Sequence, residues 1–448
     1  MLADTDLATL YQRPAELARR LIQFDTTNPP GNEAACVTFI REALAAAGIE
    51  STLLARDPGR PNLIARLPGR GEAPPLLLQG HVDVVTTEHQ DWTHPPFAGI
   101  VADGFLWGRG ALDMKGGVAM LVAAFLRARA EGAALPGDVI LCVLADEEAG
   151  GDYGARFLVE RHPELFAGVR YALGELGGFS FTLGGRRFYP IMVGEKQSCV
   201  VRATVRGPGG HGSLALRGGA AAKLGRFLTR LDRRRLPVHV TPAARAMITA
   251  LADALPRPTG LVLRRALNPR LTDRVLDLLG ERGTLFDPLL HHTANATIVR
   301  GGEKNNVIPS EITVELDGRM LPGFSADGFL GELRALAGPD VAFEIIHHDP
   351  NPAVPDLSLF SMLADVLRAA DPGGIPIPLL LAGVTDGRFF SRLGIQTYGF
   401  LPMRLPDGWN FTSLLHAADE RIPLEALAFG ADAIYQAMRR YGGMGSRP

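Results

Sequence analysis

The stretch "LLLQGHVDVV" at residues 76–85 is the most informative in this sequence, because polar side chains appear where an apolar strand enters a core. Side chains alternate along a strand, so His81 and Asp83 would point to the same face. Gly80 beside them leaves the backbone open to close approach. Such a pair is either a core histidine satisfied by its neighbour or a histidine aimed at a bound group, and the rest of the chain has to decide.

The same pattern of an apolar run followed by acids recurs further along the chain. "DVILCVLADEEAG" at 138–150 ends in three successive acids, and "YALGEL" at 171–176 ends near Glu175. A long helix is predicted between them, from about Gly117. Strands that alternate with helices predict an α/β fold with a mostly parallel sheet flanked by helices. In such sheets the polar residues just past the strand ends line the ligand crevice.

The pattern changes in the middle of the chain and predicts a second domain. "QSCVVRATVRG" at 197–207 alternates partially, as a half-exposed antiparallel strand does. We therefore expect residues 1–194 to form the first part of a larger domain, 195–350 an inserted α+β domain, and 351–448 the second part of the larger domain. Within the insertion, residues 240–290 are rich in proline and contain helical pieces.

Composition excludes several classes of protein. The chain has 448 residues, of which 46% are hydrophobic and 21% charged, and its net charge is −2, so no strong field recruits nucleic acid or an anionic membrane. The three cysteines lie far apart without a CxxC pair, which argues against a disulfide scaffold and a thiolate zinc site. No apolar signal core and no apolar run of about 20 residues is present. We expect a soluble cytoplasmic protein.

Two motif-like segments carry no function in this interpretation. "GPGGHG" at 207–212 spells the glycine pattern of dinucleotide-binding loops, but Pro208 lies inside the turn and the following helix starts late. "RLDRRR" at 230–235 lacks the interleaved aromatic residues of an RNA-binding surface, so we interpret it as a solvated helix end.

Histidine and carboxylate side chains recur at the predicted strand ends. They are His81, Asp83, Asp113, Asp146, Glu147, Glu148, Glu175 and, late in the chain, His416 in "SLLHAADER". Burying several carboxylates together is costly unless they are neutralised or bind cations. Two imidazoles with several carboxylates suit a divalent ion, most naturally zinc. Asp83 would then hold the second imidazole nitrogen of His81 and fix its tautomer.

Eight segments in order, "GHVDVV", "DWTHPPFAG", "GRGALDMKGG", "ADEEAGG", "GEL", "GGHGS", "NNVIP" and "LLHAADER", resemble a family of binuclear zinc hydrolases. This family includes aminoacylase, glutamate carboxypeptidase G and succinyl-diaminopimelate desuccinylase, and the resemblance runs from about residue 15 to 440. It implies a zinc-peptidase-like catalytic domain with an inserted ferredoxin-like lid. It also implies a metal-dependent hydrolase that cleaves an amide bond of an N-acyl amino acid or short peptide with a free carboxylate.

The resemblance implies two Zn²⁺ ions per chain, with Co²⁺ and Mn²⁺ as open alternatives. The implied metal ligands are His81, Asp113, Glu148, Glu175 and His416. Asp113 would bridge the two ions and be followed by a cis peptide bond to Met114. Glu147 would be the general base, and Asp83 would support catalysis beside His81.

In the lid, the resemblance implies that His211 stabilises the oxyanion, commonly in the site of a partner subunit, and that the lid forms a homodimer. The implied substrate-binding residues are Asn305, Asn306 and Arg319 in the lid, and Thr385 and Arg388 in the segment "GVTDGRFF". Arginine is the natural bidentate clamp for a carboxylate. The longer 240–290 segment leaves lid shape and substrate size open.

Alternatives stay open at this point. Within the enzyme class they are a succinyl-diaminopimelate desuccinylase-like activity and a di- or aminopeptidase activity. From another class, the chain could be a non-catalytic relative that acts as a binding protein. Such relatives usually lose metal ligands, whereas all five implied metal ligands are present in this sequence.

Overall fold

The computed structural model describes residues 7–350 and 354–442, and the chain divides into two compact units. Unit 1 comprises Met1–Val193, Asp356–Leu379 and Thr385–Pro448, and unit 2 comprises Gly194–Pro355 and Leu380–Val384. The expected divisions follow residues 194 and 350, whereas the units divide after Val193 and Pro355, and Leu380–Val384 groups with unit 2. The expected start of the second part of the larger domain, at residue 351, lies outside the described residues.

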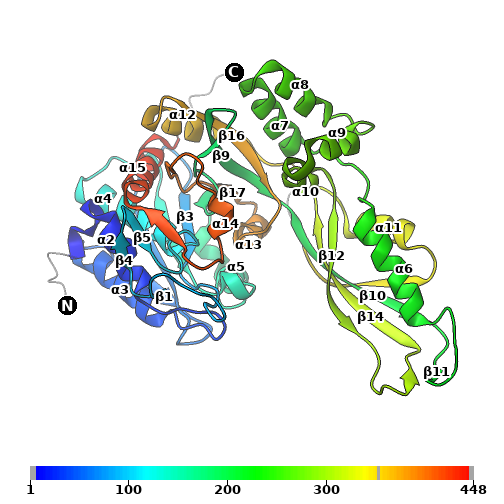
Figure 1. Cartoon of the computed structure of the whole chain (residues 1–448). Helices are drawn as coiled ribbons and strands as arrows, with labels where there is room; N and C mark the ends of the chain where they lie inside the picture. Colours follow the sequence, from blue (N-terminus) through cyan, green and yellow to red (C-terminus); the bar gives the residue numbers. More distant parts are fainter. Residues whose placement is uncertain (1–6, 351–353, 443–448) are drawn as a thin grey trace. The chain divides into compact units, whose positions relative to one another are not determined.

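Unit 1 is built around a large sheet with helices packed on it (Figure 1). Its strands are β1 (Ser51–Leu54), β2 (Asn62–Leu67), β3 (Leu76–His81), β6 (Val139–Leu144), β7 (Tyr171–Gly174), β8 (Phe181–Leu183), β9 (Arg186–Glu195), β16 (Gly374–Leu381) and β17 (Gln396–Gly399). A small separate sheet contains β4 (Ile100–Ala102), β5 (Phe105–Trp107) and β18 (Arg421–Pro423). The helices are α2 (Pro14–Ile22), α3 (Ala34–Ala46), α4 (Lys115–Ala130), α5 (Ala155–Arg161), α12 (Phe360–Ala370), α13 (Gly387–Phe390), α14 (Phe411–Leu414) and α15 (Leu424–Arg440).

The centre of the large sheet is parallel, as the alternation of strands and helices predicts. The strand order is β1-β2-β6-β3-β7-β17-β9-β16, in which β6, β3, β7 and β17 pair in parallel. β1, β2 and β9 extend the sheet in antiparallel pairings. Because parallel strands end at the same edge, the polar residues that follow β3, β6 and β7 come together there.

The glycine in the opening stretch allows a helix to approach the sheet closely. A Cβ at Gly80 would lie 2.4 Å from the Met114 side chain and 3.2 Å from Val118 of α4. Strand β3 ends at His81, so Asp83 lies in the loop that follows rather than within the strand as expected. On the face that carries Leu77, the core includes residues of α5 and α13 such as Leu158 and Phe389.

Unit 2 has a four-stranded antiparallel sheet with the order β12-β14-β10-β15. Its elements are β10 (Gln197–Arg206), β11 (Gly210–His211), α6 (Ala220–Arg233), α7 (Pro242–Ala254), α8 (Arg257–Arg265), α9 (Thr272–Leu279), α10 (Asp287–Leu290), β12 (Thr293–Arg300), β13 (Val307–Ile308), β14 (Glu311–Met320), α11 (Ala326–Ala337) and β15 (Val341–Asp349). Leaving out the helical segment and the short β11–β13 pair, the chain order is β-α-β-β-α-β, which is the predicted ferredoxin-like arrangement.

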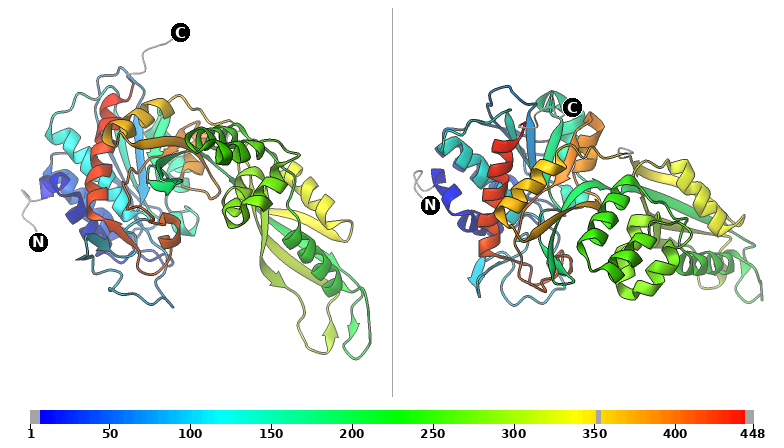
Figure 2. Two further views of the ribbon diagram at one scale, coloured as in Figure 1. Left: turned by 45° about the horizontal axis from the view of Figure 1, so that its top comes forward. Right: turned by 90° about the horizontal axis from the view of Figure 1, so that it is seen from above.

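Helices α6 and α11 cover one face of the sheet in unit 2, and the core between them includes Phe227, Leu333 and Val201. The proline-rich segment at 240–290 forms a separate helical group, α7 to α10, beside this sheet (Figure 2). Within the described ranges, none of the helices combines the length and the apolar character needed to cross a bilayer.

Candidate metal centre

His81 is presented with one ring nitrogen fixed by the backbone. Its Nδ1 lies 3.0 Å from the carbonyl oxygen of Asp83. Because a carbonyl oxygen only accepts hydrogen bonds, Nδ1 carries the proton and Nε2 of the neutral ring keeps its lone pair. This Nε2 lies 3.2 Å from Asp113 Oδ1 and 3.6 Å from Glu175 Oε2. A lone pair that faces two carboxylates is repelled by both unless a proton or a metal cation lies between them.

The side chains of His81, Asp113 and Glu175 therefore form a first cluster of candidate metal ligands. Burial opposes a charged imidazole, yet the carboxylates of Asp113, Asp83 and Glu175 outweigh burial and raise the pKa of His81 well above its ordinary value. Burial also raises the pKa of Glu175. The local potential thus attracts a positive charge into a site that water barely reaches.

Asp113, Glu148 and His416 form a second cluster that shares Asp113 with the first. Nε2 of His416 lies 3.3 Å from Asp113 Oδ2 and 3.3 Å from Glu148 Oε2. The two carboxylates raise the pKa of His416 to about 10. The peptide bond between Asp113 and Met114 is cis, as the family resemblance implies.

Both clusters fit divalent cations by an independent observation. Nε2 of His81 and Oε1 of Glu148 are buried polar atoms without a hydrogen-bond partner among the described residues. Such atoms are costly unless something satisfies them. Imidazole nitrogens and carboxylate oxygens are ligands of zinc and related ions, and the shared Asp113 is placed to serve two ions.

A buried carboxylate that faces neither histidine holds the loop of Asp113. Glu420 accepts hydrogen bonds from the backbone N–H groups of Leu112 at 2.7 Å, Asp113 at 3.0 Å and Gly110 at 3.1 Å. Its charge is paired with Arg109 at 2.7 Å. Sequence reasoning missed this residue, although it lies inside the quoted motif "LLHAADER", because nothing local shows what its carboxylate contacts.

Glu147 lies beside the clusters without belonging to either. Burial, reinforced by the charge of Glu175, raises its pKa well above the ordinary value for a carboxyl group. Its Oε1 lies 3.4 Å from Nη1 of Arg388, and 12% of its side chain is exposed. A carboxylate with a raised pKa that solvent still reaches is suited to accept a proton from water and return it.

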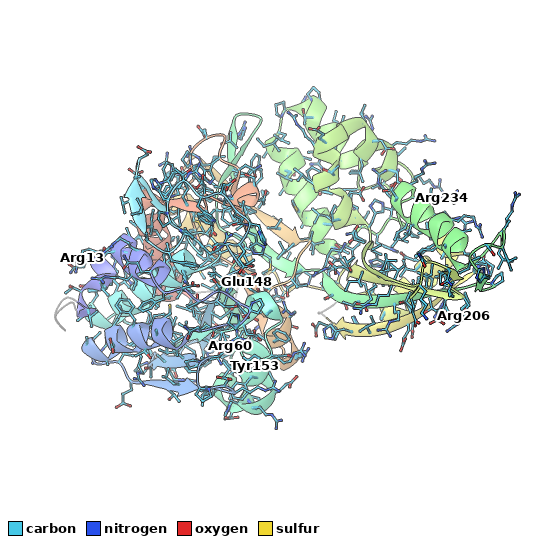
Figure 3. All side chains as sticks on the ribbon, turned by 60° about the horizontal axis from the view of Figure 1, so that its bottom comes forward. Arg13, Arg60, Glu148, Tyr153, Arg206 and Arg234 are labelled. Atoms are coloured by element: carbon cyan, nitrogen blue, oxygen red, sulfur yellow. The ribbon has the colours of Figure 1, made fainter. Side chains whose placement is uncertain are left out.

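Asp83 is placed differently from the expectation. Its carboxylate oxygen lies 3.4 Å from Nδ1 of His81, further than its own carbonyl oxygen does. The carboxylate accepts the backbone N–H groups of Glu147 and Glu148, each at 3.1 Å. It therefore holds the backbone turn at residues 146–153, here named the acid turn, which carries Glu147 and Glu148. Figure 3 labels Glu148 and Tyr153 of this turn.

Three of the expected lid residues lie together in unit 2. β11 pairs with β13 so that His211 lies opposite Val307, and the N–H of Gly212 donates to the carbonyl oxygen of Asn306. Asn305 precedes Asn306 in the same exposed loop. Nδ1 of His211 lies 2.8 Å from Ser213 Oγ. The structure thus brings the histidine and the two asparagines together at one small two-stranded sheet, the β11–β13 pair.

Arg319 does not lie beside the β11–β13 pair. It lies near the far end of β14, and the distance along the strand from Glu311 is roughly 26 Å at about 3.3 Å per residue. Its Nε and Nη2 bond to the carboxylate of Asp317 at 2.8 and 3.2 Å. The two-nitrogen edge expected to clamp a substrate carboxylate is occupied by this neighbour.

Thr385 and Arg388 lie at the start of α13 in unit 1. The Thr385 hydroxyl accepts the N–H of Gly387 at 3.0 Å, and its carbonyl oxygen accepts from Nη1 of Arg388 at 3.1 Å. Asp386 between them is buried, and burial raises its pKa to about 7. Of these residues, Arg388 is the one that the structure brings to Glu147.

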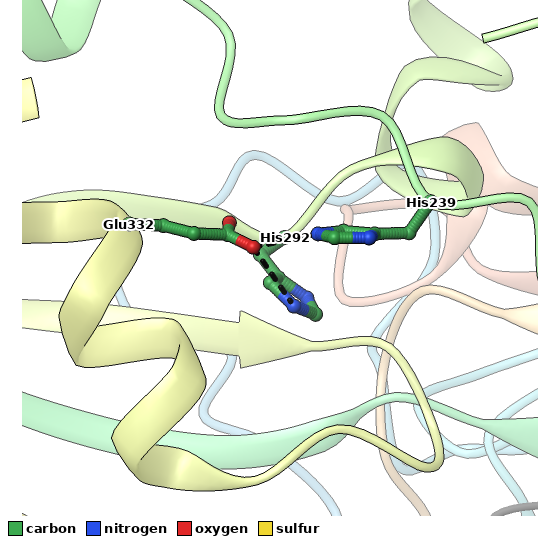
Figure 4. A group of neighbouring side chains, drawn as sticks. All are labelled: His239, His292 and Glu332. Carbon is green, nitrogen blue, oxygen red and sulfur yellow. Dashed lines mark hydrogen bonds and ion pairs between the residues drawn. The ribbon is translucent and has the colours of Figure 1, made fainter. Parts of the chain in front are cut away.

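A third group of candidate ligands, His239, His292 and Glu332, lies in unit 2 (Figure 4). Nε2 of His239 lies 2.6 Å from Glu332 Oε1, and Nε2 of His292 lies 3.9 Å from the same oxygen. The N–H of Leu321 donates to Nδ1 of His292 at 3.0 Å, so Nε2 carries the proton of the neutral ring. Burial lowers the pKa of His292 to about 3. This nitrogen is a donor facing a carboxylate, so we describe the group as a histidine–carboxylate hydrogen bond beside a buried neutral histidine rather than as a metal cage.

A parallel sheet with two ligand clusters at its carboxyl edge defines an α/β metal-binding hydrolase. Residues 77–440 match the pattern of peptidase family M20/M25/M40, and the chain belongs to this family. Succinyl-diaminopimelate desuccinylase of Paracoccus denitrificans is 28% identical over 96% of this chain and 98% of its own length. Aminoacylase-1 of Sus scrofa is 27% identical over 94% of this chain and 93% of its own.

The fold is also that of solved structures. An M20 family metallo-carboxypeptidase from Sulfolobus solfataricus superimposes with a TM-score of 0.69 at 16% identity, over 96% of this chain and 99% of that one. The predictions of the family, of the α/β fold with a mostly parallel sheet, and of a hydrolase are thereby confirmed.

Proposed function

We propose that this protein hydrolyses an amide bond of an N-acyl amino acid or a short peptide that carries a free carboxylate. The observation that supports this most is the sharing of Asp113 by two ligand clusters, with Glu147 lying beside both. The similarity to aminoacylase-1 and to succinyl-diaminopimelate desuccinylase supports the same bond type.

In this proposal His81 and Glu175 would hold one Zn²⁺, Glu148 and His416 would hold the second, and Asp113 would contribute to both. Bound ions would act as Lewis acids that lower the pKa of a water and polarise the scissile carbonyl. Co²⁺ and Mn²⁺ have compatible ligand preferences, so the donor set alone does not select zinc.

Glu147 is the proton carrier in the proposed reaction. Its raised pKa suits a group that takes a proton from water and delivers it to the leaving amine. Arg388, at 3.4 Å, keeps a positive charge beside this carboxyl group and so limits the rise of its pKa. Asp83 acts through the backbone of the acid turn rather than on the substrate.

The lid residues have separate proposed roles. His211 donates to the oxyanion of the tetrahedral intermediate, and Asn305 and Asn306 contact substrate from the same β11–β13 pair. Arg319 clamps the substrate carboxylate only if it exchanges Asp317 for substrate. A homodimer formed through the lid would allow the β11–β13 pair to serve the site of a partner subunit.

Apolar side chains pack against one side of the metal centre. Phe179, Met403 and Phe411 line a small, nearly closed hollow together with Asp113 and Glu175. The rings of Phe179 and Phe411 stack with centroids 4.1 Å apart. The hollow is too small to take an acyl group, so it supports the candidate ligands and does not select among the substrates.

Metal analysis combined with a substrate panel tests the proposal. The panel contains N-acetyl, N-succinyl and long-chain N-acyl amino acids and several dipeptides, each with and without added zinc. We expect about two ions per chain and hydrolysis of N-acyl amino acids in the panel. A preference for the N-succinyl substrate or for dipeptides would select an alternative enzyme activity. Full metal occupancy without any hydrolysis would favour the non-catalytic binding protein.

A further inference from the structure

The side chain of Asn28 lies between two buried carboxylates that belong to neither ligand cluster. Only 4% of Asn28 is exposed. Its Nδ2 donates to Asp83 Oδ2 at 2.8 Å and to Asp146 Oδ1 at 3.0 Å. A side-chain amide has two hydrogens on this nitrogen, so both are used. Asn28 therefore links the two acids through one neutral group.

Each of the two acids holds one end of the acid turn. Asp83 accepts the N–H groups of Glu147 and Glu148 at the start of the turn. Asp146 accepts the N–H of Tyr153 at 3.0 Å at its end. The orientation of the proposed base and of a proposed ligand thus depends on where these two carboxylates are held.

The acid turn is also under backbone strain that its contacts must hold. Asp146 has a φ of 69°, in the left-handed region that residues other than glycine seldom adopt. Arg60 supports it by an ion pair of 2.9 Å with Asp146 and by its position 4.8 Å from the ring centroid of Tyr153. Arg60 and Tyr153 are both labelled in Figure 3.

The charges around Asn28 explain why a neutral donor occupies this position. Glu33, Asp83 and Asp146 are all buried, and Arg60 is the guanidinium that pairs with Glu33 at 2.6 Å and with Asp146. Asp83 receives no bond from Arg60 and stays available to His81 and the acid turn. A carboxylate at position 28 would add a fourth acid and remove both donors.

We propose that Asn28 is a positioning residue of the active site, whose amide joins Asp83 to Asp146 and thereby orients the turn that carries Glu147 and Glu148. This inference rests on the proposed function for its kinetic consequence. Its geometric content, the orientation of Glu148 toward a bound metal, is independent of the substrate.

The test replaces Asn28 and compares turnover with substrate affinity in fully metal-loaded protein. For Asn28→Ala we expect kcat to fall about 10- to 100-fold while KM changes less than about threefold, as is typical when a partner of a metal ligand is lost. The kcat of Asn28→Asp should fall further because two donors become acceptors that face two carboxylates. Asn28→Ser keeps one donor, so its kcat should lie between those of wild type and Asn28→Ala. This variant keeps the proposal testable if the other two fail to fold.

Gln396→Ala is the matched control. Gln396 also donates two bonds from one amide nitrogen, to the carbonyl oxygens of Val193 and Thr397 at 2.9 and 3.0 Å. It lies at the opposite end of β17 from the edge that carries Glu175. We expect a lower melting temperature and an unchanged kcat. If folded Asn28 variants likewise lose only melting temperature and keep kcat within twofold, the proposal is overturned.

A spectroscopic measurement separates this inference from the proposed function. The protein is loaded with Co²⁺, and the visible absorption of wild type is compared with that of Asn28→Ser and Gln396→Ala. We expect a changed band for Asn28→Ser and the wild-type band for the control. A wild type that hydrolyses nothing overturns the proposed function while the cobalt spectrum still tests Asn28. An unchanged spectrum together with unchanged kcat overturns the role of Asn28 alone.

Discussion

The two clusters that share Asp113 differ in how the chain holds their histidines. His81 ends a buried strand and exposes 1% of its side chain, whereas His416 lies in a loop and exposes 52%. His416 also has a φ of 59°, so a strained loop rather than a strand presents it. A buried imidazole among carboxylates depends on a cation for compensation, while the half-exposed imidazole of His416 can be solvated. We therefore expect the two ions to be held with different strength.

The largest effect should come from Glu147, which belongs to neither cluster. We expect Glu147→Gln to lower turnover about 10²- to 10⁴-fold, the usual contribution of a general base, while both ions stay bound. Kinetics and metal analysis of the same preparation check this. Glu160→Gln, an exposed acid on α5, is the control and should change neither quantity. Near-normal turnover of Glu147→Gln would remove Glu147 from the role of base.

A smaller but more selective effect should separate the two clusters. We expect His416→Ala to retain about one ion per chain and His81→Ala to lose stability as well as metal, because its buried carboxylates stay uncompensated. In wild type, a chelator should remove the ion of the His416 cluster first. Metal content against time in chelator measures the order. Loss of both ions at a single rate would contradict the difference between the clusters.

The smallest effect concerns pH in the metal-free protein. The pKa of His416 is raised to about 10 by Asp113 and Glu148, so its proton stabilises the folded state. This stabilisation is complete below the unfolded pKa of about 6.5 and is lost as pH rises through about 10. It should be below about 1 kcal/mol, because the side chain is half exposed.

Melting temperatures of chelated wild type and His416→Gln from pH 6 to 10 provide the check for this effect. The difference between the two proteins should shrink as pH rises. A difference that grows toward pH 10 would contradict the sign of the pKa shift.

The candidate ligands could be recognised from sequence because each belongs to a local pattern. His81 and Glu175 follow apolar runs, and strand ends of a parallel sheet meet at one edge. His416 has no such lead-in, and its role as a ligand was implied by the resemblance of "LLHAADER" to a family motif. The α+β character of unit 2 could be predicted from partial alternation, and its ferredoxin-like arrangement was implied by the family resemblance. The number and packing of the helices at 240–290 could not be predicted.

The residues that hold the ligands could not be recognised in this way. Asn28 and Asp146 are 118 positions apart in the chain, and Glu420 reaches the backbone of Asp113 across 307 positions. Arg319 was expected to bind substrate together with Asn305 and Asn306, yet the length of β14 separates it from them. Nothing in the sequence near these residues shows which buried group each one contacts.

The sequence by itself determined the class of fold, the acid-tipped strands and the identity of the donor atoms, because these depend on local alternation and side-chain chemistry. Only the tertiary structure decided that Glu420 holds the loop of Asp113, that the carboxylate of Asp83 holds the acid turn, and that Arg388 lies beside Glu147. These relations depend on close packing between segments distant in the chain, and such packing is set by the whole core rather than by any one stretch.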